Sequence, residues 1–396
     1  MKILFVIGGE LRINSSANLC HLAYLRGFVA AGHTVTLLTA ADDGATLDPA
    51  LTIPRSVKTC AYGVSLYEKL SHIKKQVAQH ENVPAAAVGS EPSANGGMTA
   101  KLKGGLRALY GVYGPDHAWH MHAKHFRSGE SYDYMISVSC PFISHRTAYE
   151  LLRRGNVRCG KWIQIWEDPW YGDLAGDFHT DAALREERFL CAAAQDVIYV
   201  SPVTLMYQQK LFPESAQKMR FVPTPSYDTA QHGAAGDPHT FGYFGDYAPS
   251  VRNLRPFYEA AKDAAIRAVI CGSSSAPFES AENVEVHPRL SLSALAVYEK
   301  SAGTLVFLCN LSGGQIPGKI FQYSATNKPI LFILDGTAEE QQAIRDYFSP
   351  LRRYVFCENN KEDIKKAIDV ILSGQAPSHP LDCFSAAKTV DAILSE

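Results

Sequence analysis

The sequence has little excess charge, no long hydrophobic run and no closely spaced cysteines. Its strongly apolar runs, such as Ile3–Ile7 and Pro329–Leu334, are far shorter than the ~20 residues that cross a bilayer as a helix. Lys and Arg number 38 against 40 Asp and Glu, a formal net charge of −2, whereas nucleic-acid-binding proteins are normally basic. We therefore expect neither a membrane-spanning protein nor a nucleic-acid-binding one.

The nine cysteines form no Cys-x-x-Cys pair, and their number is odd. This argues against a zinc ribbon and against a disulfide framework. Cys271, Cys309 and Cys357 stand inside apolar runs, where a reduced cysteine packs as a small hydrophobic side chain. The apolar start at Ile3–Ile7 is too short for a signal peptide and predicts a first strand. Together these features favour a cytoplasmic location.

Two ligand-binding motifs are also missing. Gly8-Gly9 follows the first apolar run, but the full Gly-x-Gly-x-x-Gly fingerprint is absent, which counts against a nicotinamide or flavin enzyme. No Asp-x-Asp motif is present to hold a divalent ion. The sequence therefore predicts no bound cofactor and no metal site.

One histidine-rich stretch raises a metal site as an alternative. His117, His120, His122 and His125 fall within nine residues, and Asp116 is the only carboxylate beside them. Zinc sites usually draw their ligands from several elements, so a solvated basic face is the favoured interpretation.

What the sequence does contain is a regular alternation of strands and helices. A strand at Lys2–Ile7, a helix at Ala17–Ala31 and a strand at Thr34–Thr39 form a βαβ unit with parallel strands. The further elements expected in the first half are Ser56–Tyr62, Tyr134–Ser139, Ser144–Arg153, Lys161–Trp166, Thr180–Ala194, Val197–Val200 and Phe221–Val222.

A second alternating series follows a segment rich in Gly, Ala, Asp and His at Ala230–Pro238. Its expected strands are Thr240–Phe244, Ala268–Cys271, Val284–Val286, Thr304–Leu308, Pro329–Leu334 and Tyr354–Cys357, and its helices are Asn253–Ala264, Ser291–Lys300, Lys319–Ala325, Ala338–Phe348, Lys361–Leu372 and Ser385–Leu394. We predict an α/β chain of two doubly wound, Rossmann-like domains that face a cleft. The predicted parts are residues 1–225, a linker at 226–239, residues 240–380, and a C-terminal helix in 381–396 that could return to the first domain.

Ligands of open parallel sheets bind beyond the carboxyl ends of the strands, so the loops at these ends are candidate sites. Gly313 and Gly314 precede a predicted helix that begins near Lys319, and Gln322 lies one turn further along. A helix N-terminus with a lysine attracts phosphate, and the Gln322 amide can bind hydroxyl groups. The alternative is a tight loop that lets the helix pack on the sheet.

A second candidate loop begins at Gly245 and carries Arg252 and Asn253 towards the next helix, and Gly272 ends the neighbouring strand. Arg252 could bind a phosphate through two parallel hydrogen bonds. An exposed arginine at a helix start is the equal alternative.

The first half offers a third candidate at Glu167 and Asp168, two carboxylates between tryptophans that would suit sugar rings and hydroxyl groups. A turn capped by Asp168 is the alternative. Gly9 and Ser139, which end other strands of this half, complete the expected acceptor side.

Several segments, in the expected order over most of the chain, resemble the GT-B glycosyltransferases, most closely the retaining family 4 of bacterial polysaccharide-building enzymes. Ile316–Ile330, with the sequence IPGKIFQYSATNKPI, is similar to the signature Pro-x-Lys-x-x-Glu-Tyr-x-Ala-x-Gly-Lys-Pro. The other matching segments are Lys2–Ile7, Leu25–Thr39, Tyr132–Pro141, Glu167–Trp170 and Phe241–Leu254.

The resemblance implies a glycosyltransferase that moves a sugar from a UDP- or GDP-linked donor to a glycan or lipid-linked acceptor, in cell-surface polysaccharide or glycoconjugate synthesis. Lys319 and Arg252 would hold the diphosphate without a metal, and Gln322 would meet the ribose. The family usually has Glu where this chain has Gln322, and a second acid where it has Gly314. Retention of configuration is implied by the resemblance, whereas an inverting enzyme would use Asp168 as its base.

Two alternatives remain open: a non-catalytic GT-B subunit that binds a partner transferase, and a sugar-nucleotide epimerase on the same fold. A peripheral membrane contact is a further expectation. Lys101–Arg127 carries five Lys and Arg against one acid, so Lys101, Lys103 and Arg107 could hold the segment on an anionic membrane beside a lipid-linked acceptor. An ordinary surface helix is the equal alternative.

Overall fold

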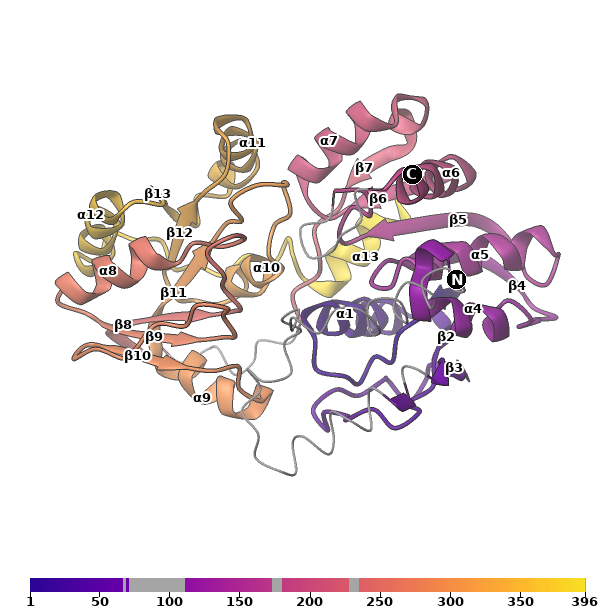
Figure 1. The fold of residues 1–396 in the computed structure, drawn as a ribbon, viewed down its shortest axis with the longest axis horizontal. Helices are drawn as coiled ribbons and strands as arrows, with labels where there is room; N and C mark the ends of the chain where they lie inside the picture. The colour runs from indigo at the N-terminus through magenta and orange to yellow at the C-terminus, as the bar shows by residue number, and fades with distance from the viewer. Residues whose placement is uncertain (67–68, 71–110, 173–179, 228–234, 396) are drawn as a thin grey trace, which may run out of the picture. The chain divides into compact units, whose positions relative to one another are not determined.

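The computed structural model describes residues 1–66, 69–70, 111–172, 180–227 and 235–395 (Figure 1). It contains two sheets, one of seven strands and one of six. In both sheets the strand order departs from the chain order at the first strand, as in doubly wound α/β folds. The predicted fold class of two Rossmann-like α/β domains is confirmed.

The seven-stranded sheet has the order β3-β2-β1-β4-β5-β6-β7. Its strands are β1 (Lys2–Val6), β2 (Thr34–Ala40), β3 (Lys58–Tyr62), β4 (Ser131–Val138), β5 (Arg158–Trp166), β6 (Asp196–Tyr199) and β7 (Met219–Phe221). β1, β2, β3, β4 and β5 pair in parallel. The apolar residues of β1 and β4 are buried on both faces, which is why these segments read as near-continuous apolar runs.

Helices and short turns connect these strands. The helices are α1 (Ser16–Ala30), α4 (His117–Ala123), α5 (Ile143–Arg153), α6 (Asp181–Ala193) and α7 (Pro202–Leu211), and 3₁₀ turns cover η2 (Gly111–Asp116) and η3 (Pro213–Lys218). The sequence analysis missed α7. Its signal is Ser201, whose hydroxyl accepts hydrogen bonds from the amides of Val203 and Thr204 just before Pro202 at the first helical position.

The six-stranded sheet has the order β10-β9-β8-β11-β12-β13, and its paired strands are parallel. Its strands are β8 (Asp237–Phe244), β9 (Arg267–Cys271), β10 (Val284–His287), β11 (Ala302–Leu308), β12 (Ile330–Leu334) and β13 (Val355–Glu358). β8 begins at Asp237, inside the predicted linker, because Asp237 pairs with Ala302 of β11.

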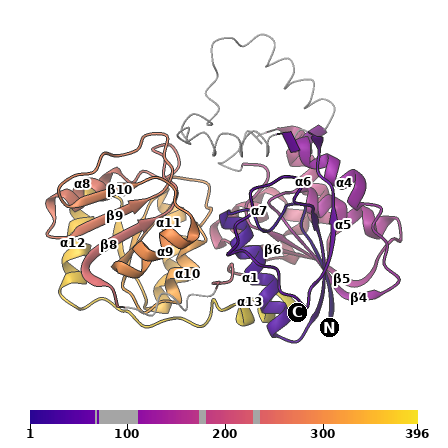
Figure 2. The ribbon, with the colours of Figure 1, turned by 90° about the horizontal axis from the view of Figure 1, so that it is seen from below.

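Helices cover both faces of this sheet. They are α8 (Arg255–Asp263), α9 (Leu292–Ser301), α10 (Lys319–Ser324), α11 (Ala338–Phe348) and α12 (Lys361–Leu372). The last helix of the chain, α13 (Ala386–Leu394), does not belong to this set. One apolar cluster joins α8 and α12 to the sheet, and a second joins α9, α10 and α11 to the opposite face (Figure 2).

The described residues divide into two compact units. The first contains the chain up to Val197, except Leu22–Phe28 of α1 and Gly172, and the second contains these residues and the chain from Ile198 onward. α13 packs on α1 at Gly27, where an added Cβ would lie 2.8 Å from the carbonyl oxygen of Ala386. Within the described residues, every helix is too short or too polar to cross a membrane.

A buried lysine holds the junction between α9 and β11. Lys328 is 1% exposed, and its ammonium donates hydrogen bonds to the carbonyl oxygens of Glu299 (2.6 Å), Lys300 (3.0 Å) and Ala302. Burial lowers the pKa of Lys328 to about 8. These carbonyls lie at the C-terminal end of α9, where helical partners run out, so the lysine caps the helix.

Lys328→Met should destabilise the protein by about 1–3 kcal/mol, because the variant leaves buried carbonyl groups without a donor. Urea unfolding followed by circular dichroism measures this change, and Lys300→Met, a change at an exposed lysine on the same helix, is the matched control. Equal unfolding midpoints for the two variants would contradict a capping role for Lys328.

Candidate functional site

Arg252 lies in the loop between β8 and α8, three residues before the helix begins, rather than at the helix start that the sequence predicts. Its Nε donates to Oδ1 of Asn310 at 2.7 Å, and an Nη donates to the carbonyl oxygen of Asp246 at 2.9 Å. Asn310 follows β11 and Asp246 follows β8, two neighbouring strands in the middle of the sheet. The guanidinium is therefore anchored across the carboxyl ends of both strands, and it remains partly exposed.

Lys319 is the first residue of α10, and its ammonium lies 2.8 Å from Oε1 of Glu299. Glu299 is only 8% exposed and belongs to α9. Glu299 was not predicted as a site residue, because it lies 20 positions from Lys319 and the sequence does not reveal contacts over such a distance. In this structure the predicted phosphate-binding lysine is paired with a nearly buried carboxylate.

Gly313 and Gly314 both have positive φ angles, +88° and +72°. They lie several residues before α10, so they do not form its N-terminus. A Cβ on Gly314 would lie 2.5 Å from Cγ1 of Val203. The carbonyl oxygen of Gly314 accepts hydrogen bonds from the hydroxyls of Ser201 and Thr204. Glycine is required at position 314 by this packing and by the left-handed backbone.

The other residues predicted to contact the nucleotide sugar differ in whether their side chains have free hydrogen-bonding groups. Gln322 is 5% exposed, and its side-chain amide makes no hydrogen bond to the residues that the structure describes. Asn253 uses its side chain locally, since Oδ1 accepts from the amide of Arg255 at 3.3 Å. A Cβ on Gly272 would lie 2.0 Å from the carbonyl oxygen of Gly245, so close backbone packing at the ends of β8 and β9 requires glycine at position 272.

The strand ends of the first sheet bring Ser139 beside Glu167. Ser139 is fully buried, and its hydroxyl accepts a hydrogen bond from the amide of Glu167 at 2.8 Å. Its own amide donates to the carbonyl oxygen of Ile165 at 2.9 Å. Ser139 thus joins the ends of β4 and β5. Gly9 is half-buried, and its carbonyl oxygen accepts from the hydroxyl of Thr39 at 2.6 Å.

Glu167 has a partner that the sequence analysis missed. Its Oε2 lies 3.1 Å from Nε2 of His21, a residue of α1 that is 0% exposed. Nδ1 of His21 and Oε1 of Glu167 are also buried, and neither has a partner among the described residues. A histidine in the first turns of the helix after β1 was the available signal, because that helix begins at the same sheet edge as the β5 loop.

Asp168 is partly exposed, and its Oδ2 accepts a hydrogen bond from Sγ of Cys140 at 3.7 Å. Glu187 of α6 holds the loop that carries Asp168 through two hydrogen bonds. The Glu187 carboxyl accepts hydrogen bonds from the amides of Trp170 (3.3 Å) and Tyr171 (2.7 Å). Burial raises the pKa of Glu187 to about 8, so this carboxyl is largely protonated at neutral pH.

The histidine-rich stretch forms no metal site in the part of the chain that the structure describes, where no group of three or more His, Cys, Asp or Glu could hold an ion. Nδ1 of His120 lies 2.9 Å from the hydroxyl of Thr147. Burial, together with the neighbouring His117, lowers the pKa of His120 to about 3, so the ring is neutral. Lys101, Lys103 and Arg107 lie outside the described residues.

No protein-family model matches the sequence, and no curated protein matches it. Solved structures do match. Sucrose-phosphate synthase from Thermosynechococcus elongatus has a TM-score of 0.56 and 13% identity over 100% of this chain and 94% of its own. HepE from Anabaena, solved with UDP-glucose, has a TM-score of 0.53 and 11% identity over 99% and 94%.

AviGT4, a glycosyltransferase involved in avilamycin A biosynthesis, has a TM-score of 0.51 and 11% identity over 99% of this chain and 95% of its own. At such identities the likeness defines the fold. The chain shares the two parallel-sheet, Rossmann-like domains of the GT-B glycosyltransferases.

Glu187→Gln should remove a pH dependence of stability between about pH 4.5 and pH 8. Because the folded pKa of Glu187 is raised, its contribution is fully present below about pH 4.5 and is lost as the pH rises through 8. Glutamine stays neutral, so the variant should lack the pH-dependent loss of a few kcal/mol that the wild type shows, at about 1.4 kcal/mol per pKa unit. Its amide nitrogen cannot accept a hydrogen bond, so one of the two bonds from Trp170 and Tyr171 is lost at every pH.

Urea unfolding followed by tryptophan fluorescence measures this effect, since Trp119, Trp162, Trp166 and Trp170 all lie in the first unit. Glu282→Gln, a change at an exposed carboxylate, is the control. Parallel pH profiles for Glu187→Gln and the wild type would mean that Glu187 is ionised throughout.

Proposed function

We propose that the chain is a glycosyltransferase that transfers a sugar, of hexosyl type, from a UDP- or GDP-linked donor to a glycan or lipid-linked acceptor. The observation that carries the proposal is a pair of cations in the second unit: Arg252, anchored at the carboxyl ends of β8 and β11, and Lys319 at the start of α10. Structural similarity also supports the proposal, since the whole chain matches proteins such as HepE, whose structure holds UDP-glucose.

The two cations have different tasks in this proposal. Arg252 is preorganised by Asn310 and Asp246, so it meets the donor diphosphate without reorienting. Lys319 exchanges its contact with Glu299 for a contact with the diphosphate. Both stabilise the negative charge that builds up on the leaving nucleoside diphosphate as the sugar bond breaks. Gln322 binds the ribose through its amide.

The first sheet supplies the acceptor side. Asp168 is partly exposed and could meet an acceptor hydroxyl, whereas buried His21 acts by positioning Glu167. We favour retention of configuration, on the resemblance to family 4, with the diphosphate taking the proton of the acceptor. Asp168 is the base if the enzyme inverts. A role in cell-surface polysaccharide or glycoconjugate synthesis, with a peripheral membrane contact, belongs to the same proposal.

Binding of nucleoside diphosphates tests the donor site directly. Calorimetric titration of UDP, GDP and dTDP should identify one nucleotide that binds, and its sugar conjugate should release that nucleotide in the presence of an acceptor. A non-catalytic subunit should bind none of them. An epimerase should convert the sugar nucleotide into an isomer without release.

The variants must leave no buried charge without a partner, because Glu299 alone would be an uncompensated carboxylate. Glu299→Gln frees Lys319 and should keep or strengthen nucleotide binding. Glu299→Gln with Lys319→Met should weaken it at least tenfold, since a hydrogen bond to a charged group contributes about 1.5–3 kcal/mol. Wild-type affinity in the double variant would exclude Lys319 from the donor site.

Transfer activity should survive chelation, because the proposal assigns the diphosphate charge to Arg252 and Lys319. Rates measured with and without excess EDTA should agree. Loss of activity in EDTA that magnesium or manganese restores would replace this arrangement with a metal-bound donor.

A further inference from the structure

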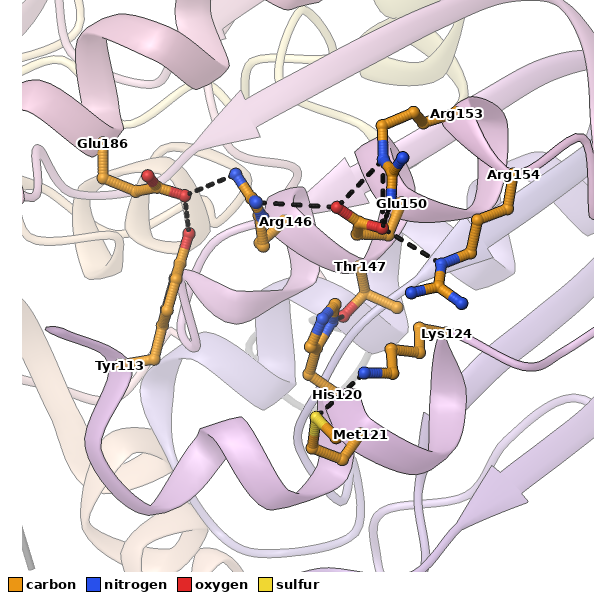
Figure 3. A network of polar contacts seen from close by, with 10 residues as sticks. All are labelled: Tyr113, His120, Met121, Lys124, Arg146, Thr147, Glu150, Arg153, Arg154 and Glu186. Carbon is orange, nitrogen blue, oxygen red and sulfur yellow. Dashed lines mark hydrogen bonds and ion pairs between the residues drawn. The ribbon is translucent and has the colours of Figure 1, made fainter. Parts of the chain in front are cut away.

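A second cationic site lies in the first unit, over α4, α5 and α6. Two hollows of about 780 Å³ and 510 Å³ adjoin there and share Arg146, Glu150 and Arg153 among their walls. We call them together the arginine groove. The residues that carry the argument are Lys124, Arg146, Glu150, Arg153, Arg154 and Glu186 (Figure 3).

Three arginines converge on one buried carboxylate. Glu150 is 6% exposed, and its oxygens lie 2.8 Å from Arg153, 3.1 Å from Arg154 and 3.5 Å from Arg146 (Figure 3). The hydrogen bond from Arg153 is the main cause that lowers the pKa of Glu150 to about 2. One carboxylate cannot neutralise three guanidinium groups, so positive charge is left over at fixed positions.

The rest of the lining does not remove this excess. With Lys124 and Arg185, the groove has five cations against the two carboxylates of Glu150 and Glu186. His117 and His120 also line the groove. Their pKa values are lowered, mainly by burial, so both rings are uncharged near neutral pH and do not change this balance.

Several hydrogen-bond donors face the groove without an oxygen partner. Arg154 reaches Glu150 through Nε alone, which leaves both Nη groups without a described partner. The ammonium of Lys124 has only the thioether sulfur of Met121, at 2.9 Å, among the described residues. Both residues border the smaller hollow. Such donors match the oxygens of a phosphate or a carboxylate.

The groove is connected to the loop that carries Asp168. Glu186 accepts hydrogen bonds from Arg146 (3.1 Å) and from the hydroxyl of Tyr113 (2.8 Å). The Tyr113 ring lies 4.8 Å from the ring of Trp170, which belongs to the β5 loop. Direct side-chain contacts thus join the wall of the groove to the loop that carries Asp168.

We propose that the arginine groove binds an anionic segment of a saccharide acceptor, one that carries phosphate or carboxylate groups. Binding of the anion depends only on the groove, whereas its assignment to an acceptor rests on the proposed function. Tyr149 and Phe189, whose rings lie 4.9 Å apart on the wall of the larger hollow, provide flat apolar surfaces for sugar rings.

Calorimetric titration of the full chain with an oligogalacturonate and with tripolyphosphate tests the proposal, and a neutral maltooligosaccharide is the uncharged probe. At least one anion should bind, more weakly as salt rises, and the neutral sugar should not. Arg153→Gln with Arg154→Gln should weaken binding at least tenfold, and Lys124→Met, which leaves all Glu150 contacts intact, should weaken it severalfold. Arg55→Gln, a change at an exposed arginine outside the groove, should bind as the wild type does.

The donor-site variant with Glu299→Gln and Lys319→Met separates the two sites, because it should leave anion binding in the groove unchanged. Failure of the wild type to bind nucleotides would defeat the proposed function but leave the groove result standing. The proposal is overturned if neither anion binds, or if Lys124→Met and the double arginine variant both bind as the wild type does. It is also overturned if binding to phosphatidylglycerol vesicles depends on Arg153 and Arg154 while binding of the soluble anions does not.

Discussion

Parallel strands that are covered on both faces favour apolar side chains along their middle, and this constraint shapes both sheets. The buried Ser137 and Gln164 are exceptions, and both are hydrogen-bonded. β1 buries every side chain after Lys2, the second half of β4 is buried, and β11 and β12 bury all of their side chains. The charged and polar groups of the chain are therefore displaced to the loops that follow the strands. Arg252 across β8 and β11, and Glu167 beyond β5, are direct results of this displacement.

The same constraint explains what the sequence could predict. Short apolar runs mark the strands, and helical periodicity between them marks the helices, so α11 and α12 were predicted with the bounds that the structure shows. Arg252 and Lys319 were found because a strand end followed by a cation is a local pattern. The pairs Lys319–Glu299 and His21–Glu167 could not be found, because each joins residues 20 or 146 positions apart. Glycine patterns were ambiguous for the same reason: packing against a distant Val203 fixes Gly314.

Three buried titratable residues, Lys328, Glu150 and Glu187, differ in the number and the charge of their hydrogen-bond partners. The ammonium of Lys328 donates to three carbonyl oxygens, which suits a structural cap, and burial lowers its pKa to about 8. Glu150 has three guanidinium groups, which leaves positive charge directed outward into a hollow. Among the described residues, Glu187 has two amides and no cation as partners, and burial raises its pKa to about 8, so it is largely protonated at neutral pH. The number and charge of these partners thus decide whether a buried group only stabilises the fold or leaves unneutralised charge that a ligand can bind.

If the chain is the transferase proposed above, the contact between Lys319 and Glu299 has a consequence for the speed of its catalytic cycle. A carboxylate at 2.8 Å gives the lysine a resting partner, so any anion that binds there must compete with a group already in place. The competition weakens binding, but it also works in the other direction when the reaction is over. Glu299 can recapture the ammonium as soon as a spent anion loosens its hold, which shortens the residence time of that product. A built-in counter-ion of this kind exchanges tight binding for rapid clearance, and so favours turnover over affinity.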